Sequence, residues 1–175
     1  MAHKDKSQIG KTNAARLLDR AGIPYSVIPY TVDESNLAAD HVAAELGEDI
    51  RQVFKTLVLH GERAGHFVCV IPGNCEVDLK KAARAAGAKK ADLIPMKELL
   101  PLTGYIRGGC SPIGMKKTFP TFFHSSALDF DTIFVSAGIR GLQIAINPRQ
   151  LIDFVGAAVV DLTVAEPNQE EGLQS

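Results

Sequence analysis

The sequence predicts an α+β fold, a single domain whose mixed, mostly antiparallel sheet is curled into a barrel-like form and surrounded by helices. The 175-residue chain is 46% hydrophobic and 22% charged, which suits one soluble domain with a sizeable core. Two β-rich runs, at residues 53–60 and 66–73, are joined by a glycine-bearing turn, as in a hairpin. Helices are inserted between strands without a strict βαβ alternation, which argues against a doubly wound nucleotide-binding fold.

The N-terminal third is predicted to contain two helices and one strand. Residues 12–21 have the apolar spacing of a short amphipathic helix, which ends before Gly22. Residues 23–32 contain two prolines and are expected to form an extended strand. Residues 37–46 have a second helical pattern, and Gly47 follows at the position that commonly ends a helix.

The middle of the chain continues from the hairpin into two short helices. Asp78 is placed to cap the N-terminus of a helix over residues 79–86, which stops at Gly87. Pro95 is expected to open another short helix at residues 96–100.

The last third returns to strands, which we expect at residues 119–126, 131–138 and 141–146. Asn147 and Pro148 are predicted to start a final helix that precedes a strand at 157–163. The predicted organisation is a flexible N-terminus at 1–11, one domain at 12–164, and a disordered acidic tail at 165–175.

Composition excludes several classes of protein. No segment approaches the roughly 20 apolar residues that span a bilayer, and no apolar stretch follows the basic N-terminus as in a secretory signal. We therefore expect a cytoplasmic protein without membrane contact. A net charge of −1 argues against a large footprint on duplex DNA. Three cysteines without a CxxC pair and five scattered histidines predict neither a disulfide framework nor a metal site, and we expect no cofactor.

Local clusters of basic residues leave two interpretations open. Lys80 and Lys81 form one cluster, and Lys116 and Lys117 form another. Such clusters commonly belong to a solvated surface. A limited rim that contacts phosphates is the alternative.

Lys55 is the first candidate for chemistry. In an extended strand over residues 53–60, it shares a face with three aliphatic residues, and lysines are almost never buried without a partner. Lys55 is therefore either a functional cation or a charge at a sheet edge that prevents aggregation. Gln143 poses a similar question, because small residues flank it on its own face. That face lines either a cavity or solvent.

The segment TGYIRGGCSPIGMKK, at residues 103–117, is the densest in turn-forming residues. Gly108 and Gly109 allow a positive φ and close approach of a ligand to bare amides, and the Ser111-Pro112 pair fixes the exit from the loop. Consecutive amides of this kind bind carboxylates, phosphates or oxyanions. A purely structural turn is the alternative.

This segment does not match the common nucleotide or hydrolase motifs. It lacks the GxxxxGK[ST] and GxGxxG patterns of phosphate-binding loops. It also lacks GxSxG, so Ser111 is not placed as a nucleophile, and no base is marked beside Cys110. Tyr30 and Tyr105 are each compatible with half-buried strand aromatics.

Four segments carry a resemblance to a known family. They are FKTLV at 54–58, LKKAARAAGAKKA at 79–91, the pattern TGY..GG.SP.G.KK at 103–117, and IFVSAGIRGL at 133–142. In this order they resemble the YbaK/EbsC family of aminoacyl-tRNA deacylases, over about residues 23–163. The glycine-rich pattern is most similar to that of the bacterial Cys-tRNA(Pro) deacylases.

The resemblance implies a mixed, barrel-like domain that also occurs as the editing insertion of prolyl-tRNA synthetases. It implies hydrolysis of mischarged Cys-tRNA(Pro), which arises because cysteine and proline are similar in size. By position, Lys55 matches the lysine that the family needs for activity, and Tyr30 matches a substrate-side tyrosine. Gly108 matches the first glycine of the loop around the aminoacyl end, and Gln143 lies at a pocket position that varies among relatives.

The matched motifs add further candidates by resemblance. For binding the substrate they are Gly109, Cys110, Ser111, Pro112, Gly114, Ser136 and Gly138, and for contacting tRNA they are Lys80, Lys81, Lys116, Lys117 and Arg140. The implied partners are the acceptor end of a mischarged tRNA and prolyl-tRNA synthetase. The implied mechanism needs no protein nucleophile, because the substrate's own thiol attacks the ester and leaves as a cyclic thiolactone.

The sequence departs from the family pattern at three places. The family's Tyr-x-His-Asp run lacks its histidine at residues 30–33, Cys110 replaces an apolar residue, and the GGKRG turn reads AGIRG at 137–141. Two alternatives therefore stay open. One is a deacylase for Ala-tRNA(Pro) or another mischarged tRNA, and the other is a non-catalytic regulatory module that binds a nucleotide or a tRNA end; within the leading function, Cys-tRNA(Cys) is a further substrate to consider.

Overall fold

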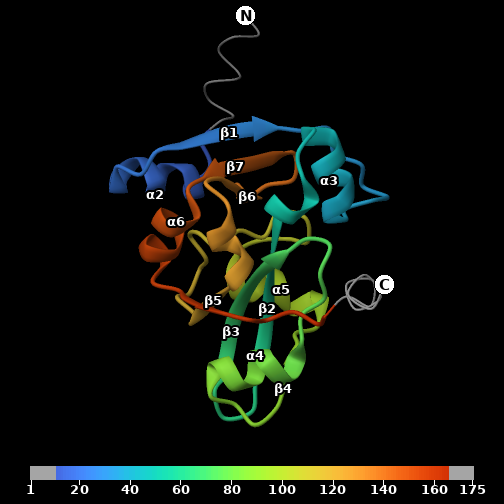
Figure 1. The fold of residues 1–175 in the computed structure, drawn as a ribbon, viewed down its shortest axis with the longest axis vertical. Coiled ribbons are helices and arrows are strands. Elements are labelled where there is room, and N and C mark those ends of the chain that lie inside the picture. The colour runs from blue at the N-terminus through green and yellow to red at the C-terminus, as the bar shows by residue number, and fades with distance from the viewer. Residues whose placement is uncertain (1–10, 166–175) are drawn as a thin grey trace, which may run out of the picture.

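The computed structural model describes residues 11–165, and their strands form two sheets (Figure 1). The smaller sheet is antiparallel and has the order β1-β7-β6. The larger sheet has the order β4-β2-β3-β5-β8, antiparallel from β4 to β3 and parallel from β3 to β8. The strands are β1 (Tyr25–Pro29), β2 (Phe54–Gly61), β3 (Gly65–Pro72), β4 (Ala91–Leu93), β5 (Thr121–His124), β6 (Ile133–Ser136), β7 (Leu142–Ile146) and β8 (Ala158–Val160).

Three helices begin at the capping residues that the sequence predicts, and the helices end at glycines. Side chains of Thr12, Asp78 and Asn147 accept hydrogen bonds from amides in the first turns of α2, α4 and α6. A glycine with positive φ ends each of α2, α3, α4, α5 and α6. Their bounds are α2 (Asn13–Ala21), α3 (Ala39–Leu46), α4 (Leu79–Ala86), α5 (Leu99–Thr103) and α6 (Pro148–Val155), with short 3₁₀ turns η1 (Ile50–Gln52), η2 (Met96–Glu98) and η3 (Ser125–Asp129).

The expected barrel is wrong in its closure, whereas the mixed α and β character and the mostly antiparallel pairing are confirmed. The two sheets meet through a single parallel bridge between Val53 and Phe134. A closed barrel needs a continuous ladder of strand pairs around its circumference. Here the Val53–Phe134 bridge is isolated and is not part of a longer strand pairing, so the strands form two separate sheets.

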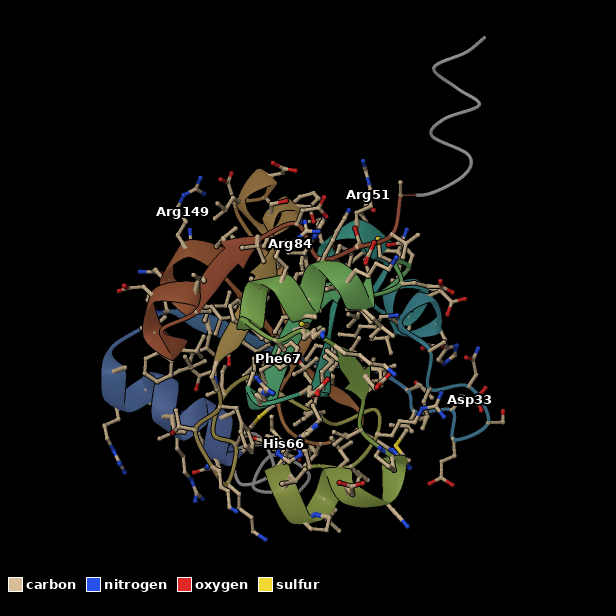
Figure 2. All side chains as sticks on the ribbon, turned by 90° about the horizontal axis from the view of Figure 1, so that it is seen from below. Asp33, Arg51, His66, Phe67, Arg84 and Arg149 are labelled. Atoms are coloured by element: carbon tan, nitrogen blue, oxygen red, sulfur yellow. The ribbon has the colours of Figure 1, made fainter. Side chains whose placement is uncertain are left out.

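Two apolar clusters hold this arrangement together. The larger one joins both sheets and includes Phe123, Ile133 and Ile144. The second lies between the other face of the β2–β3 hairpin and α4, where Phe67 packs beneath Ala82 and Ala83. Figure 2 shows α4 lying across this face, with Phe67 beneath it and Arg84 pointing outward.

Most expected elements are present with shorter bounds. The hairpin of β2 and β3 is confirmed, with Phe54 opposite Pro72 and Gly61 opposite Gly65. The helix expected at 96–100 is the short turn η2 followed by α5. Strand β4 was not predicted, because three residues are too short for an alternating pattern.

The predicted flexible N-terminus and acidic tail lie outside the described residues, apart from residues 11 and 165. No helix between residues 11 and 165 combines the length and the apolar character that crossing a bilayer requires.

Candidate active site

A cavity of about 540 Å³ lies beside the first half of β2. Its floor runs from Phe54 to Val58. One wall comes from α3 and the residues just before it, and a second comes from the segment that leads from β4 into α5. The third wall combines the glycine-rich loop with one side chain each from β6 and β7. The cavity therefore brings together segments that are far apart in the sequence.

The cavity exists because β2 is only partly covered along one edge. Strand β4 pairs with Leu59–Gly61 alone, and the amide of Ile94 reaches the carbonyl oxygen of Val58 at 3.2 Å. Successive residues of a strand direct their backbone groups to alternate edges, so the backbone N–H and C=O of Thr56 face the uncovered edge. The Thr56 hydroxyl is also buried without a hydrogen-bond partner in residues 11–165.

Lys55 lines the cavity at this edge and is half-buried. Burial lowers the pKa of its ammonium group from the ordinary 10.5, while attraction from Cys75 and Glu76 partly opposes that effect. Within residues 11–165 no hydrogen bond or ion pair engages the Lys55 side chain. The sequence allowed Lys55 to be a functional cation or a charge at a sheet edge. The structure is compatible with both, because this edge of β2 forms the floor of the cavity.

Ser136 and Gln143 enter the cavity as a cross-strand pair. They lie opposite each other on β6 and β7, so their side chains emerge on the same face of the small sheet. Gln143 is only 5% exposed, and its side-chain oxygen has no partner among the described residues. The Ser136 hydroxyl accepts a hydrogen bond from the Gly138 amide at 3.1 Å. Gln143 therefore lines the cavity with a side chain whose buried oxygen makes no hydrogen bond within residues 11–165.

The glycine-rich loop contributes Arg107, Gly108 and Cys110 to the lining. Gly108 has a φ of +84°, as the sequence allowed, whereas Gly109 is not in the positive-φ region. The Gly109 amide donates to the carbonyl oxygen of Ile106 at 2.9 Å and is occupied inside the loop. Among the described residues, the amides of Gly108 and Cys110 donate to no acceptor.

The turn between β6 and β7 holds this loop in place. The Arg140 Nε donates to the carbonyl oxygen of Arg107 at 2.8 Å, and a Cβ on Gly108 would lie 3.3 Å from that nitrogen. A Cβ on Gly109 would lie 3.2 Å from backbone atoms of Ile139 and Arg140. Arg140, expected from the resemblance to contact tRNA, thus has one guanidinium N–H committed to the loop.

Tyr105 supports the far side of the loop. Its hydroxyl donates to the carbonyl oxygen of Ile113, and burial raises the pKa of this phenol to about 12. A Cβ on Gly138 would lie 3.0 Å from the Tyr105 ring, and one on Gly114 would lie 3.2 Å from its hydroxyl. Gly114 and Gly138 therefore pack around Tyr105 and do not line the cavity.

Ser111, Pro112 and Cys110 are all buried. The Ser111 hydroxyl accepts a hydrogen bond from the Ile113 amide at 3.3 Å, which stabilises the exit from the loop. Burial raises the pKa of the Cys110 thiol to about 12, so this group stays protonated near neutral pH. A Cys110 thiolate is thus a poor candidate for a nucleophile.

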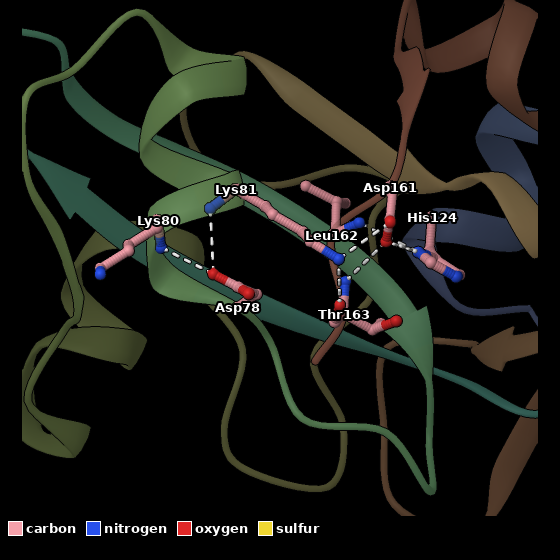
Figure 3. Close-up of polar contacts among 7 residues, drawn as sticks. All are labelled: Asp78, Lys80, Lys81, His124, Asp161, Leu162 and Thr163. Carbon is pink, nitrogen blue, oxygen red and sulfur yellow. Dashed lines mark hydrogen bonds and ion pairs between the residues drawn. The ribbon is translucent and has the colours of Figure 1, made fainter. Parts of the chain in front are cut away.

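Tyr30 and the lysine clusters do not line the cavity. The Tyr30 amide donates to the carbonyl oxygen of Gly141 at 2.9 Å, and its ring packs beside Val42 and Val53. The Lys81 ammonium pairs with Asp161 at 2.9 Å and with the carbonyl oxygen of Thr163 at 2.8 Å. Figure 3 shows these contacts, with the Lys80 side chain pointing away from them. Lys116 and Lys117 are exposed in the segment after the loop.

Sequence reasoning missed two polar groups of the cavity, Arg107 and Thr56. Each is the direct neighbour of a residue that the sequence predicted for the site, because Arg107 precedes Gly108 and Thr56 follows Lys55. That adjacency is the sequence feature that could have indicated them. Together, Lys55 and Arg107 give the lining two cations, and no Asp or Glu is among the residues that line it. The cavity is therefore suited to an anionic ligand although the whole chain has a net charge of −1.

Comparisons with known proteins agree with this geometry. Residues 33–154 match the family model described as an aminoacyl-tRNA editing domain. The chain is 45% identical to EbsC of Enterococcus faecalis, provisionally named a Cys-tRNA(Pro)/Cys-tRNA(Cys) deacylase, over 95% of this chain and 100% of that protein. It is 25% identical to the proline–tRNA ligase of Thermosipho melanesiensis over 74% of this chain and 22% of the ligase.

Solved structures show the same fold. A crystal structure described as a candidate trans-editing enzyme for prolyl-tRNA synthetase superposes with a TM-score of 0.76 and 26% identity. The match covers 89% of this chain and 99% of that one. The family model spans more than half of the chain and includes Lys55, Gly108 and Gln143. This chain belongs to the aminoacyl-tRNA editing domain family.

Proposed function

We propose that this protein is a trans-acting aminoacyl-tRNA deacylase that removes cysteine from mischarged Cys-tRNA(Pro). The observation that carries the proposal is the make-up of the cavity. Its lining includes Lys55, Gly108, Cys110 and Gln143. Among residues 11–165, no His, Asp or Glu lines the cavity, so it lacks the imidazole and carboxylate groups that most often act as general bases.

A site without a base suits a substrate that carries its own nucleophile. In the proposed reaction the cysteine sulfur forms a bond to the ester carbonyl carbon, and the bond from that carbon to the ribose oxygen breaks. The thiol proton ends on the released ribose hydroxyl. The amino acid leaves as a cyclic thiolactone, which water then opens to cysteine.

Proximity supplies much of the rate in this scheme. A free thiol has a pKa near 8.5, so a few per cent is thiolate at pH 7. Holding that thiolate against the carbonyl turns the attack into an intramolecular step and lowers the barrier by several kcal/mol. The protein therefore has to position the ester and stabilise the developing oxyanion, with no need to generate a nucleophile.

The cavity residues divide between these two tasks. The Lys55 ammonium group and the amides of Gly108 and Cys110 are the donors available for the carbonyl oxygen. The Gln143 side-chain oxygen is an acceptor for the α-ammonium group or the thiol of the substrate. Ser136, opposite Gln143, contributes a hydroxyl to the same polar wall.

The relatives support both the substrate and the partner. The name of EbsC includes Cys-tRNA(Pro) and Cys-tRNA(Cys), and the matching crystal structure is described in relation to prolyl-tRNA synthetase. A synthetic site cannot strongly reject an amino acid close in size to proline, so a second, hydrolytic site restores accuracy. We therefore propose that prolyl-tRNA synthetase supplies the mischarged tRNA, in the cytoplasm where charging takes place.

Hydrolysis of a matched panel of aminoacyl-tRNAs tests this function. Cys-tRNA(Pro), Ser-tRNA(Pro) and Ala-tRNA(Pro) are incubated with the protein, and loss of the ester is followed over time. We expect the cysteine ester to disappear far faster than the other two. Preferred cleavage of Ala-tRNA(Pro) would identify a different editing activity, and loss of none would reduce the protein to a binding module. Cys-tRNA(Cys), run in parallel, tests whether the tRNA body contributes to selection.

A further inference from the structure

The described part of the chain ends beside the segment that leads from β3 to α4. After β8, Thr163 pairs with Val77 in an antiparallel bridge. The Val164 amide then donates a hydrogen bond to the carbonyl oxygen of Glu76 at 3.0 Å. In Figure 1 this last part of the chain, in red, crosses over β3 and β2. The backbone is therefore fixed next to Glu76 just before the described residues end.

This place adjoins the cavity. Gly73, three positions before Glu76, lines the cavity, and the Glu76 carboxylate lies close enough to Lys55 to raise the pKa of its ammonium group. Lys55 and Leu57 point to the same face of β2. Leu57 lines the cavity and also packs against the apolar cluster that contains Leu162. The end of the described chain and the Lys55 side chain therefore lie on the same side of the sheet.

The cavity combines positive charge with an exposed apolar wall. Among residues 11–165, the charged side chains that line it are Lys55 and Arg107. Leu93 and Met96 belong to the same lining, yet they are 51% and 59% exposed. Large apolar residues that stay exposed at the mouth of a cavity mark a surface for another group to cover. The mouth thus suits a chain segment that carries both acids and an apolar side chain.

Residues 166–175, here called the acidic segment, have that composition. The segment reads EPNQEEGLQS, with three glutamates, one leucine and no lysine or arginine. Ten residues reach at most about 33–36 Å, well beyond the size of a cavity of about 540 Å³. The segment begins directly after residue 165, so its glutamates can reach the two cations of the lining.

We propose that the acidic segment binds in the mouth of the cavity and competes there with tRNA. Glu170 and Glu171 pair with Lys55 and Arg107. The connection through residue 165 holds these glutamates at an effective concentration in the millimolar range, so even weak ion pairs keep the site partly occupied. This contact rests on the proposed function, because it regulates the same site.

Methionine labelling detects the bound segment without any ester chemistry. The chain has three methionines, so protein labelled with ¹³C at the methionine methyl groups gives few signals. The Met96 signal is assigned with Met96→Leu and compared between the wild type and the double variant Glu170→Gln and Glu171→Gln. We expect Met96 to shift between the two proteins at low salt and Met115, outside the lining, to stay unchanged.

Salt and a matched variant show whether the shift comes from local ion pairs. The Debye length falls from about 30 Å at 0.01 M salt to about 3 Å at 1 M, so the two Met96 signals should coincide at high salt. The control is Glu62→Gln with Asp131→Asn, which removes the same charge from exposed positions outside the lining. The control should leave the Met96 signal at its wild-type position.

Kinetics of deacylation measure the competition itself. At low salt the Glu170→Gln and Glu171→Gln variant should lower KM for Cys-tRNA(Pro) about twofold or more, with kcat unchanged. The reason is that a segment at millimolar effective concentration, bound with millimolar affinity, occupies about half of the sites. The control variant should lower KM by less.

Three results would overturn this contact: equal Met96 signals in the wild type and the Glu170→Gln and Glu171→Gln variant at low salt, equal shifts in the variant and its control, or an unchanged KM. A shift that grows with protein concentration would place the segment in a second copy and overturn binding within one chain. Ester cleavage without a Met96 shift would remove this contact alone. A Met96 shift without any cleavage would instead contradict the proposed function.

Discussion

The Nε of Arg140 donates a hydrogen bond to the carbonyl oxygen of Arg107 at 2.8 Å, across 33 positions of the chain. This contact ties the turn between β6 and β7 to the loop that presents Gly108 and Cys110 to the cavity. The positions of the two amides in that loop therefore depend on a side chain that does not itself line the cavity.

Replacing Arg140 with methionine is expected to lower kcat for deacylation roughly tenfold to a hundredfold. The reason is that a hydrogen bond from a charged group contributes about 1.5–3 kcal/mol to the loop geometry. The measurement is steady-state kinetics with and without added guanidinium, which should partly restore the rate. Arg149→Met, at an exposed arginine of α6, is the control.

The same variant distinguishes positioning from contact with tRNA. A phosphate contact would raise KM and flatten the salt dependence of tRNA binding, while leaving kcat near the wild-type value. An Arg140→Met protein with that behaviour would show that Arg140 binds tRNA directly.

Replacing Lys55 with methionine is expected to reduce turnover by about 10²–10³-fold, as does loss of one preorganised donor to an oxyanion. Because Lys55 is proposed to act on the ester, binding of uncharged tRNA should change little. Single-turnover rates and tRNA affinity, measured on the same preparation, check this. Equal losses in affinity and turnover would instead assign Lys55 to a contact with a tRNA phosphate.

Replacing Gln143 with leucine is expected to separate stability from activity. The Gln143 oxygen is buried without a partner in residues 11–165, and such a group costs about 1–3 kcal/mol. The free energy of unfolding should therefore stay unchanged or rise, while KM for the aminoacyl-tRNA increases. Urea denaturation measures the free energy of unfolding, and steady-state kinetics measure KM. A destabilised variant with normal KM would mean that Gln143 is a structural residue.

Stability is expected to fall when the pH drops below about 6.5, because of His124. Its Nδ1 accepts a hydrogen bond from the Leu162 amide at 3.0 Å, which requires the unprotonated nitrogen. Burial lowers the pKa of this imidazole below the ordinary 6.5, although Asp161 and Asp129 act in the opposite direction and Lys81 adds to the lowering. The unfolded chain therefore takes up a proton first as the pH falls.

The expected sign follows from that difference in pKa. The contribution of His124 is fully present above pH 6.5 and is lost as the pH falls from 6.5 through the lower folded-state pKa. In the wild type, the urea midpoint should decrease as the pH falls through this range. The decrease should be smaller in His124→Asn, whose side-chain oxygen can still accept a hydrogen bond from the Leu162 amide. The wild-type pH dependence of the urea midpoint should persist in His60→Asn, at an exposed residue of β2. An unchanged pH dependence in His124→Asn would show that it does not come from His124.

Much of the local structure was predictable because its signals lie within a few residues of each other. Asp78 and Asn147 cap helices as expected, and the turn between β2 and β3 closes a regular hairpin. The separation of the two sheets was not predictable, because it depends on a bridge between Val53 and Phe134, which are 81 positions apart. No local pattern states whether a curled sheet closes.

Parts of the candidate site were predictable where a polar or charged residue lies among apolar or small residues of a predicted strand. The sequence allows Lys55 to be either a functional cation or an edge charge, and Gln143 to face either a cavity or solvent; in the structure both line the cavity. Arg107 and Thr56 were missed because an arginine in a loop and a threonine in a strand conflict with nothing. The apolar wall at Leu93 and Met96 was missed because it depends on how far β4 extends along β2, which is a tertiary property.

Cleavage of a blocked substrate tests the central claim most directly. Cys-tRNA(Pro) and its S-methylated form differ by one methyl group, which removes the nucleophile and keeps the apolar character of the side chain. We predict rapid ester cleavage with release of a thiolactone from the free thiol, identified by mass spectrometry after an acid quench, and essentially no cleavage of the methylated ester. Comparable rates for the two esters would contradict attack by the substrate's own sulfur, since the cavity would then be activating water by other means.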